Sequence, residues 1–174
     1  MISRRTFHKI GLGSTAAVTI GASAFRGRQA SAQETFEINK TNAEWKKILT
    51  SEQYRIMRQQ GTEPSHSSPL DKVYSKGTYY CAACNLALYS SDTKYDSRTG
   101  WPSFWKPLDN AVGRSTDYKL LYPRTEIHCR RCGSHLGHVF NDGPAPTGLR
   151  YCMNGAALKF VKSTQENKGS KSDG

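Results

Sequence analysis

The sequence contains no hydrophobic run long enough to cross a bilayer. The nearest candidate, Ile10 to Phe25, is rich in Gly, Ala, Ser and Thr. It is also shorter than the roughly 20 apolar residues that a spanning helix needs. We therefore expect no stable membrane insertion.

The same stretch has the surroundings of an export signal. It follows the Arg4-Arg5 pair in Ser3 to Phe7, and it is followed by the small residues Ala30-Ser31-Ala32. This pattern predicts a twin-arginine-type signal peptide over residues 1–32 that is cleaved near Ala32, and an exported, periplasmic mature protein. The alternative is a segment that stays uncleaved as an N-terminal anchor.

Blocks of like charge and internal repeats are also absent. The formal net charge is +11, but five basic residues and no acids lie in residues 1–32, which leaves +6 over residues 33–174. These basic residues are scattered, which is typical of a solvated surface, so we expect no nucleic-acid partner. The mature chain is long enough for one domain with its own core.

The sequence has only five cysteines, and four of them form two C-x-x-C pairs, Cys81/Cys84 and Cys129/Cys132. Two such pairs can close one tetrahedral Zn²⁺ site with Zn–S distances of about 2.3 Å. The residue after each pair, Asn85 or Gly133, is of a type that tolerates the positive φ often needed in a zinc knuckle. The sequence thus predicts one structural zinc ion that ties two distant hairpins together.

Three other uses of these cysteines remain open at this stage. An oxidising compartment favours two disulfides, although zinc loaded before export of a folded protein would keep the thiolates occupied. A single C-x-x-C can be a thioredoxin-like redox motif, but Cys81-Ala82-Ala83-Cys84 lacks the βαβ setting of that motif. A mixed site that includes His135 or His138 is the third possibility.

Hydrophobic spacing predicts a mainly β fold with short N-terminal helices. Helical periodicity runs from Thr41 to Gly61 with a break near Leu49-Thr50-Ser51, Thr41 or Asn42 as the first N-cap, and Ser51 as the second. Strand-like segments follow, separated by Pro and Gly, at 77–81, 86–89, 125–129, 139–140, 151–153 and 157–161. We expect an antiparallel β domain over residues 33–161 and a disordered tail over residues 162–174.

The fifth cysteine, Cys152, stands apart from the pairs and is a candidate nucleophile. In a strand Arg150, Cys152 and Asn154 share one face, which would then carry a cation, a thiol and an amide. His135 and His138 are three residues apart, so a flat strand would separate them, and Gly137 is expected to bend the chain. Without further information, a lone cysteine is more often a small buried hydrophobe.

Several longer motifs resemble one family, the B-type methionine sulfoxide reductases. They are Lys94-Tyr95-Asp96-Ser97, the run Gly100-Trp101-Pro102-Ser103-Phe104, the segment from Cys129 to Pro144, and Thr147 to Asn154. The likeness extends from about Trp45 to Phe160, and its motifs are long and specific.

The resemblance implies two small antiparallel sheets with a structural Zn²⁺ on Cys81, Cys84, Cys129 and Cys132. It implies thiol-dependent reduction of the R epimer of methionine sulfoxide, free or in proteins, with Cys152 attacking the sulfoxide sulfur and becoming a sulfenic acid. It also implies roles for the residues around the thiol. One group holds the pocket, protonates the departing oxygen and lowers the thiol pKa: His135, His138, Asp142, Arg150 and Asn154. Trp101 and Phe140 are expected to receive the methyl group of the substrate.

The chain departs from the family pattern at two places. Many members carry a second, resolving cysteine just before the Gly-Trp-Pro-Ser-Phe run, where this chain has Thr99, and the usual Ser after Asn154 is Gly155. With four cysteines assigned to zinc, Cys152 has no internal disulfide partner. We therefore expect an external reductant, either a thioredoxin-like protein or a small thiol.

Two other functions compete with this one. A non-catalytic, zinc-stabilised β scaffold that binds a protein partner would leave the polar residues around Cys152 without a shared purpose. A Cys-His acyl hydrolase would form a stable acyl-enzyme and would need no thiol for turnover.

Overall fold

The computed structural model describes residues 35–164. The predicted signal peptide and residues 165–174 of the predicted tail lie outside the described residues. Within residues 35–164, no helix has both the length and the apolar character needed to cross a membrane.

Two short helices precede the strands, as the periodicity predicts: α1 (Asn42–Ile48) and α2 (Ser51–Gln59). Both begin with a complete capping box, in which Thr41 pairs with Glu44 and Thr50 pairs with Gln53. The expected cap of the second helix, Ser51, was therefore wrong by one residue, because the Thr50 hydroxyl accepts the hydrogen bond from the Gln53 N–H.

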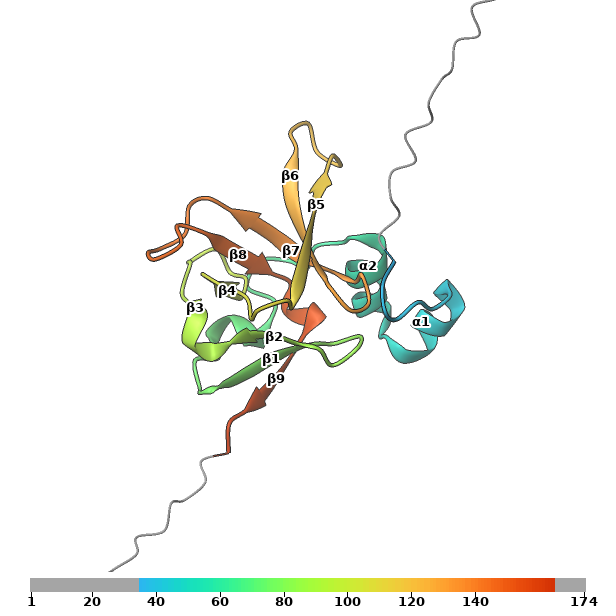
Figure 1. Cartoon of the computed structure of the whole chain (residues 1–174), viewed down its shortest axis with the longest axis horizontal. Coiled ribbons are helices and arrows are strands. Elements are labelled where there is room, and N and C mark those ends of the chain that lie inside the picture. The colour runs from blue at the N-terminus through green and yellow to red at the C-terminus, as the bar shows by residue number, and fades with distance from the viewer. Residues whose placement is uncertain (1–34, 165–174) are drawn as a thin grey trace, which may run out of the picture. The chain divides into compact units, whose positions relative to one another are not determined.

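The strands form two antiparallel sheets, as predicted from the resemblance (Figure 1). The smaller sheet has the order β2-β1-β9, and the larger one has the order β3-β4-β8-β7-β6-β5. The bounds are β1 (Gly77–Cys81), β2 (Ala87–Ser90), β3 (Lys94–Tyr95), β4 (Ser103–Phe104), β5 (Val112–Asp117), β6 (Arg124–Cys129), β7 (His135–Phe140), β8 (Arg150–Met153) and β9 (Leu158–Lys162). Short 3-10 helices occupy Pro69–Lys72, Ser91–Thr93 and Gly155–Ala157.

Three strands, β3, β4 and β5, were not expected from the sequence. The first two have two residues each, and β5 is mostly exposed with Gly, Arg and Ser in its middle, so none shows a clear alternation of apolar residues. At the other end, β9 includes Lys162, which was assigned to the tail, and the Ser163 N–H donates to the Lys76 carbonyl.

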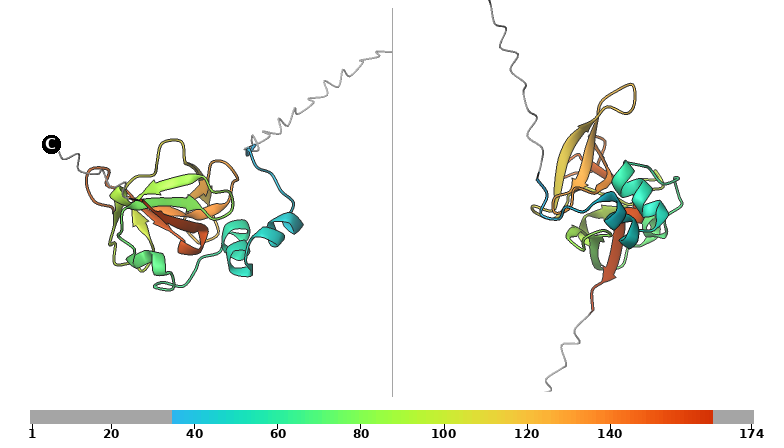
Figure 2. Two further views of the ribbon diagram at one scale, coloured as in Figure 1. Left: turned by 90° about the horizontal axis from the view of Figure 1, so that it is seen from below. Right: turned by 90° about the vertical axis from the view of Figure 1, so that its right-hand side faces the viewer.

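Aromatic side chains join the two sheets. Tyr89 of β2 stacks on Phe104 of β4 with ring centroids 4.3 Å apart, and Tyr79 of β1 meets the same ring edge-on at 5.0 Å. The Tyr89 hydroxyl also donates to the sulfur of Met153 on β8. Because this packing holds β8 and its neighbour β4, it fixes the strand that carries Cys152. The helices lie together at one end of the sheets (Figures 1 and 2).

Candidate active site and cysteine cluster

Strand register places a row of polar residues across the larger sheet. Cys152 of β8 lies opposite Ser103 of β4 on one side and opposite His138 of β7 on the other. The row continues from His138 to Glu126 of β6. Directly opposed residues in antiparallel strands share a face, so this register brings the thiol and an imidazole together.

His135 reaches the same region through a β-bulge. The register of β6 and β7 shifts between Ile127 and His128, so that one extra residue of β7 lies between His135 and Gly137. The two imidazole rings, His135 and His138, lie 5.3 Å apart. The departure from a flat strand is thus a bulge directly beside Gly137, and it changes the alternation. Gly137 is also needed for close approach, since a Cβ there would lie 2.1 Å from the Cys152 carbonyl oxygen.

Each histidine is held by a buried carboxylate that the sequence did not single out. His138 Nε2 lies 2.8 Å from Asp117 Oδ2, and His135 Nδ1 lies 2.7 Å from Glu126 Oε1. Since an ionised carboxylate only accepts, the hydrogen of each imidazole in these contacts lies on the nitrogen that faces the acid. Asp117 and Glu126 therefore set the ring orientation and the tautomer of both histidines.

Burial and charge act in opposite directions on these groups. Burial lowers the pKa of His138, although its hydrogen bond to Asp117 opposes this shift. Burial would raise the pKa of Asp117, but hydrogen bonds from the Lys119 N–H, His138 and Arg124 hold it well below its usual range. At neutral pH, the His138 imidazole is therefore neutral and the Asp117 carboxylate beside it is ionised.

Arg150 is fixed from outside the pocket by Asp142. Its guanidinium donates two hydrogen bonds of 2.9 Å to the two carboxylate oxygens, and it lies 4.4 Å from the centroid of the Phe140 ring. The Asp142 side chain is 63% exposed. Asp142 therefore positions the arginine and does not line the pocket.

Glu63 connects the other side of the site. Its N–H donates to the Asn154 side-chain oxygen at 2.9 Å, and its carbonyl accepts from the Trp101 indole at 3.1 Å. Its carboxylate accepts from the N–H groups of Gly155 and Ala156. One buried residue, 3% exposed, thus holds both Trp101 and Asn154.

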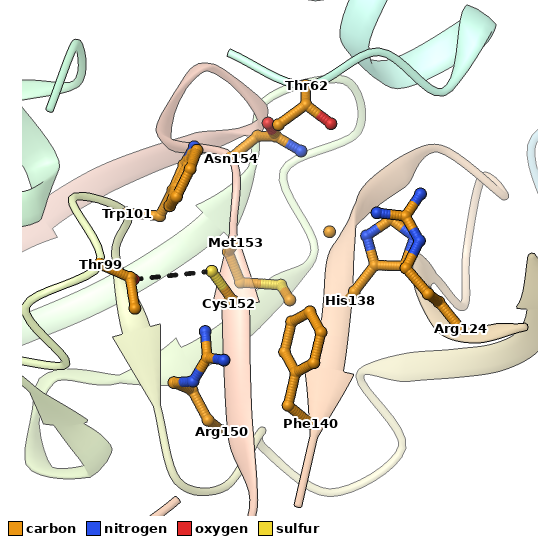
Figure 3. A pocket seen from close by; sticks show the side chains of 11 residues that line it. Thr62, Thr99, Trp101, Arg124, His138, Phe140, Arg150, Cys152, Met153 and Asn154 are labelled. Carbon is orange, nitrogen blue, oxygen red and sulfur yellow. Dashed lines mark hydrogen bonds between the residues drawn. The ribbon is translucent and has the colours of Figure 1, made fainter. Parts of the chain in front are cut away.

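A pocket of about 280 Å³ lies within this part of the structure (Figure 3). The Cys152 sulfur lies in the middle of the group, with Trp101 and Thr99 on one side and His138 and Phe140 on the other. The full lining comprises Thr62, Thr99, Trp101, Arg124, Gly137, His138, Phe140, Arg150, Cys152, Met153 and Asn154.

The Cys152 thiol does not have the lowered pKa that the resemblance implies. Burial raises the pKa of Cys152, and the Arg150 charge and the hydroxyls of Thr99 and Ser103 oppose this only in part. The Thr99 hydroxyl lies 4.0 Å from the sulfur. In the free protein the group is therefore a thiol at neutral pH, with its proton still in place.

The two C-x-x-C segments have the same backbone pattern. Cys81 N–H donates to the Leu86 carbonyl, and Asn85 N–H donates back to the Cys81 carbonyl. In the second segment, Cys129 makes the matching pair of bonds with Ser134 and Gly133. The predicted positive φ is present at both turns, 57° at Asn85 and 64° at Gly133.

The four sulfurs of these segments form one cluster, with their ligand atoms within 4.8 Å of one another. Cys81 and Cys132 are 3.8 Å apart, Cys84 and Cys129 are 3.5 Å apart, and all five cysteines of the chain are free. A tetrahedron with metal–sulfur bonds of about 2.3 Å has edges of about 3.8 Å, so the cluster can hold a metal ion. The alternative of two disulfides is not formed among these cysteines.

Known proteins resemble this chain over the part that contains both features. The SelR domain family matches residues 49–162. A peptide methionine sulfoxide reductase MsrB of Leptospira interrogans is 59% identical over 128 residues, which cover 73% of this chain and 98% of that protein. The chain belongs to the B-type methionine sulfoxide reductase family.

Two further members of this family show similar coverage. The MsrB of Methanosarcina barkeri is 52% identical over 75% of this chain and 92% of its own length. The MsrB of Acinetobacter baumannii strain SDF is 48% identical over 76% and 96%, respectively. In each case the matched region is almost the whole relative.

Not all of the residues predicted from the family resemblance meet in the pocket. Cys152, His138, Arg150, Asn154, Trp101 and Phe140 line it, whereas His135 and Asp142 do not. Thr62 and Arg124 line it without having been predicted. No sequence pattern marks these two residues. Thr62 lies just after α2 and Arg124 lies at the start of β6, and only the fold brings them to the pocket.

Proposed function

We propose that this protein reduces the R epimer of methionine sulfoxide in peptides to methionine, with Cys152 as the nucleophile. The observation that carries the proposal is the pocket itself: a lone thiol among two aromatic rings and the polar groups of His138, Arg150 and Asn154. The relatives are named as peptide methionine sulfoxide reductases, which agrees with this chemistry.

The pocket has separate places for the parts of the substrate. Trp101 and Phe140 offer apolar surface to the methyl group, and the polar groups offer hydrogen bonds to the sulfoxide oxygen. The sulfoxide sulfur is a stereocentre. When the pocket fixes its methyl group and its oxygen, the rest of the peptide points out of the pocket in one epimer only. The choice of the R epimer follows the family resemblance.

The reaction balances with the thiol as it is found. The Cys152 sulfur attacks the sulfoxide sulfur, the oxygen passes to Cys152 and the thiol hydrogen ends on that oxygen, so that the products are methionine and a Cys152 sulfenic acid. The sulfoxide is reduced by two electrons and the cysteine is oxidised by the same two. A protonated thiol therefore carries the proton that the step needs, and His138 is placed to transfer it.

Regeneration requires a thiol from outside the chain. The other four cysteines belong to the cluster, and Thr99 lies where a resolving cysteine would face Cys152. An external thiol displaces water from the sulfenic acid to form a mixed disulfide, and another thiol releases Cys152. A thioredoxin-like protein and a small thiol are both suitable reductants.

Zinc is the metal that fits the cluster best, because four thiolates in a tetrahedron are a typical structural zinc site. Cys81, Cys84, Cys129 and Cys132 would hold it, and it would brace the two knuckles. With the predicted signal peptide, the proposal places this repair activity in the periplasm, where the thiol donor must also be found.

An epimer-resolved assay tests the proposal. Purified protein of measured zinc content is incubated with the R and S epimers of a methionine sulfoxide peptide and with dithiothreitol. We expect thiol-dependent conversion of the R epimer only, and none by Cys152→Ser. Turnover by Cys152→Ser, or without thiol, would exclude the mechanism. Failure of the wild type to reduce either epimer would favour the non-catalytic scaffold or the hydrolase.

A further inference from the structure

The tip of the β5–β6 hairpin, residues 118–122, is the most apolar exposed segment of the described chain. Leu121 is fully exposed, and Tyr118, Leu120 and Tyr122 are 76%, 48% and 60% exposed. The other large exposed apolar side chains among residues 35–164 stand singly, as Ile48 does. Single exposed apolar residues are ordinary, whereas a contiguous group marks an interaction surface.

This hairpin tip is continuous with the rim of the pocket. The last paired residues of the two strands are Asp117, which holds His138, and Arg124, which lines the pocket. On its other side the tip is tied to the end of α2, because Lys119 Nζ donates to the carbonyls of Gln59 and Gln60. Thr62, which follows shortly after, also lines the pocket. The hairpin projects from the edge of the sheet (Figure 1).

The pocket itself is too small for a polypeptide. A cavity of about 280 Å³ accommodates one side chain, so the residues on either side of a methionine sulfoxide must lie across the rim. An extended chain advances about 3.3 Å per residue, so residues a few positions away from the sulfoxide reach the hairpin tip.

The chemistry of the expected substrate matches this surface. Methionine is mostly buried in protein cores and in Met-rich interfaces, and its oxidation disrupts both. The residues that flank an accessible methionine sulfoxide in a damaged protein are therefore often apolar, and they become exposed together with it.

We propose that the hairpin tip binds apolar residues that flank the methionine sulfoxide in a polypeptide substrate. This inference rests on the proposed function and adds a substrate preference. The protein should act on methionine sulfoxide in an unfolded, apolar stretch more readily than in a polar stretch or in the free amino acid. A second copy of the chain is the main competing occupant of such a surface.

The test compares kcat/KM for two short peptides of equal charge, in which methionine sulfoxide is flanked by Leu and Phe or by Ser and Gly. N-acetyl-methionine sulfoxide amide serves as the substrate without flanks. We expect the wild type to prefer the apolar peptide, and Leu121→Ser to reduce this preference about 10-fold, as for the loss of one buried leucine contact. Ile48→Ser, at an exposed apolar site that does not line the pocket, should keep the preference unchanged.

Each other result has a distinct meaning. An unchanged preference in Leu121→Ser, with melting temperatures equal to the wild type, overturns the inference. A wild-type dimer in sedimentation that becomes a monomer in Leu121→Ser, without a change in preference, assigns the surface to self-association and also overturns it. Failure of the wild type to reduce even the small amide overturns the proposed function itself.

Discussion

Glu126 is the buried charge whose loss should affect this fold most clearly. Its side chain is 9% exposed and accepts hydrogen bonds of 2.7 Å from both His135 and Ser115, and Gln60 donates to it as well. Burial alone would raise its pKa, but the hydrogen bonds from His135 and Ser115 outweigh burial and lower the pKa from 4.5 to about 2. The substitution Glu126→Gln keeps the shape and removes the charge.

The size of the effect follows from the pKa. A fall from 4.5 to about 2 corresponds to about 3 kcal/mol of folding free energy at neutral pH. Because the folded pKa is depressed, this contribution is complete above about pH 4.5 and is lost as the pH falls through about 2. We expect Glu126→Gln to lose about 3 kcal/mol at pH 7, or roughly 10 °C in melting temperature for a domain of this size.

Urea denaturation followed by circular dichroism measures this loss, with equal metal content in both proteins. The difference in unfolding free energy between wild type and Glu126→Gln should fall to about half of its pH 7 value at pH 3. Glu52→Gln, an exposed acid in the first turn of α2, is the matched control and should cost less than about 1 kcal/mol. A loss for Glu126→Gln that is below about 1 kcal/mol, or that is the same at both pH values, would refute the reasoning.

Four further predictions follow from the site and its surroundings. Because burial raises the pKa of Cys152 above 9.0, its alkylation by iodoacetamide should accelerate through pH 9, and a plateau below that pH would contradict the burial effect. Cys84→Ser should lose bound zinc and melt at lower temperature, whereas Cys152→Ser should keep its zinc, as elemental analysis will show. Gly155→Ala should cost about 1–3 kcal/mol in urea denaturation, because the new Cβ would lie 1.8 Å from the Ser68 hydroxyl, and adding Ser68→Gly should recover most of this loss. Thr99→Cys, at the residue whose hydroxyl lies 4.0 Å from the Cys152 sulfur, should form an intramolecular disulfide on oxidation by substrate, whereas the wild type should show only a dimedone-reactive sulfenic acid by mass spectrometry.

Gly155 illustrates what a contact can add to a sequence comparison. The sequence shows only that the usual serine is missing after Asn154. In the structure the space for that side chain is taken by Ser68, which belongs to a distant segment. The glycine and the neighbouring loop therefore form one packing unit, and neither can be assessed alone.

The local features of this chain could be predicted from its sequence, because they depend on neighbours. The capped helices, the bounds of β1 and the positive φ at Asn85 and Gly133 all follow from side-chain chemistry within a few residues. The meeting of the two C-x-x-C segments in one cluster was also predictable, since two pairs of this spacing can share one tetrahedral ion.

The site was only partly predictable, because strand register and burial decide which side chains meet. The sequence indicated Cys152 and His138, but the bulge that brings His135 beside them arises from the pairing of β6 with β7. The holding carboxylates, Asp117 and Glu126, come from strands that lack a clear catalytic pattern.

The sequence by itself determined which atoms are available: four thiolates at knuckle spacing, one thiol outside them, and no cysteine at Thr99 to resolve it. Only the tertiary structure decided the electrostatics of that thiol. Burial between three strands raises the pKa of Cys152, and this depends on the water excluded by residues far away in the chain.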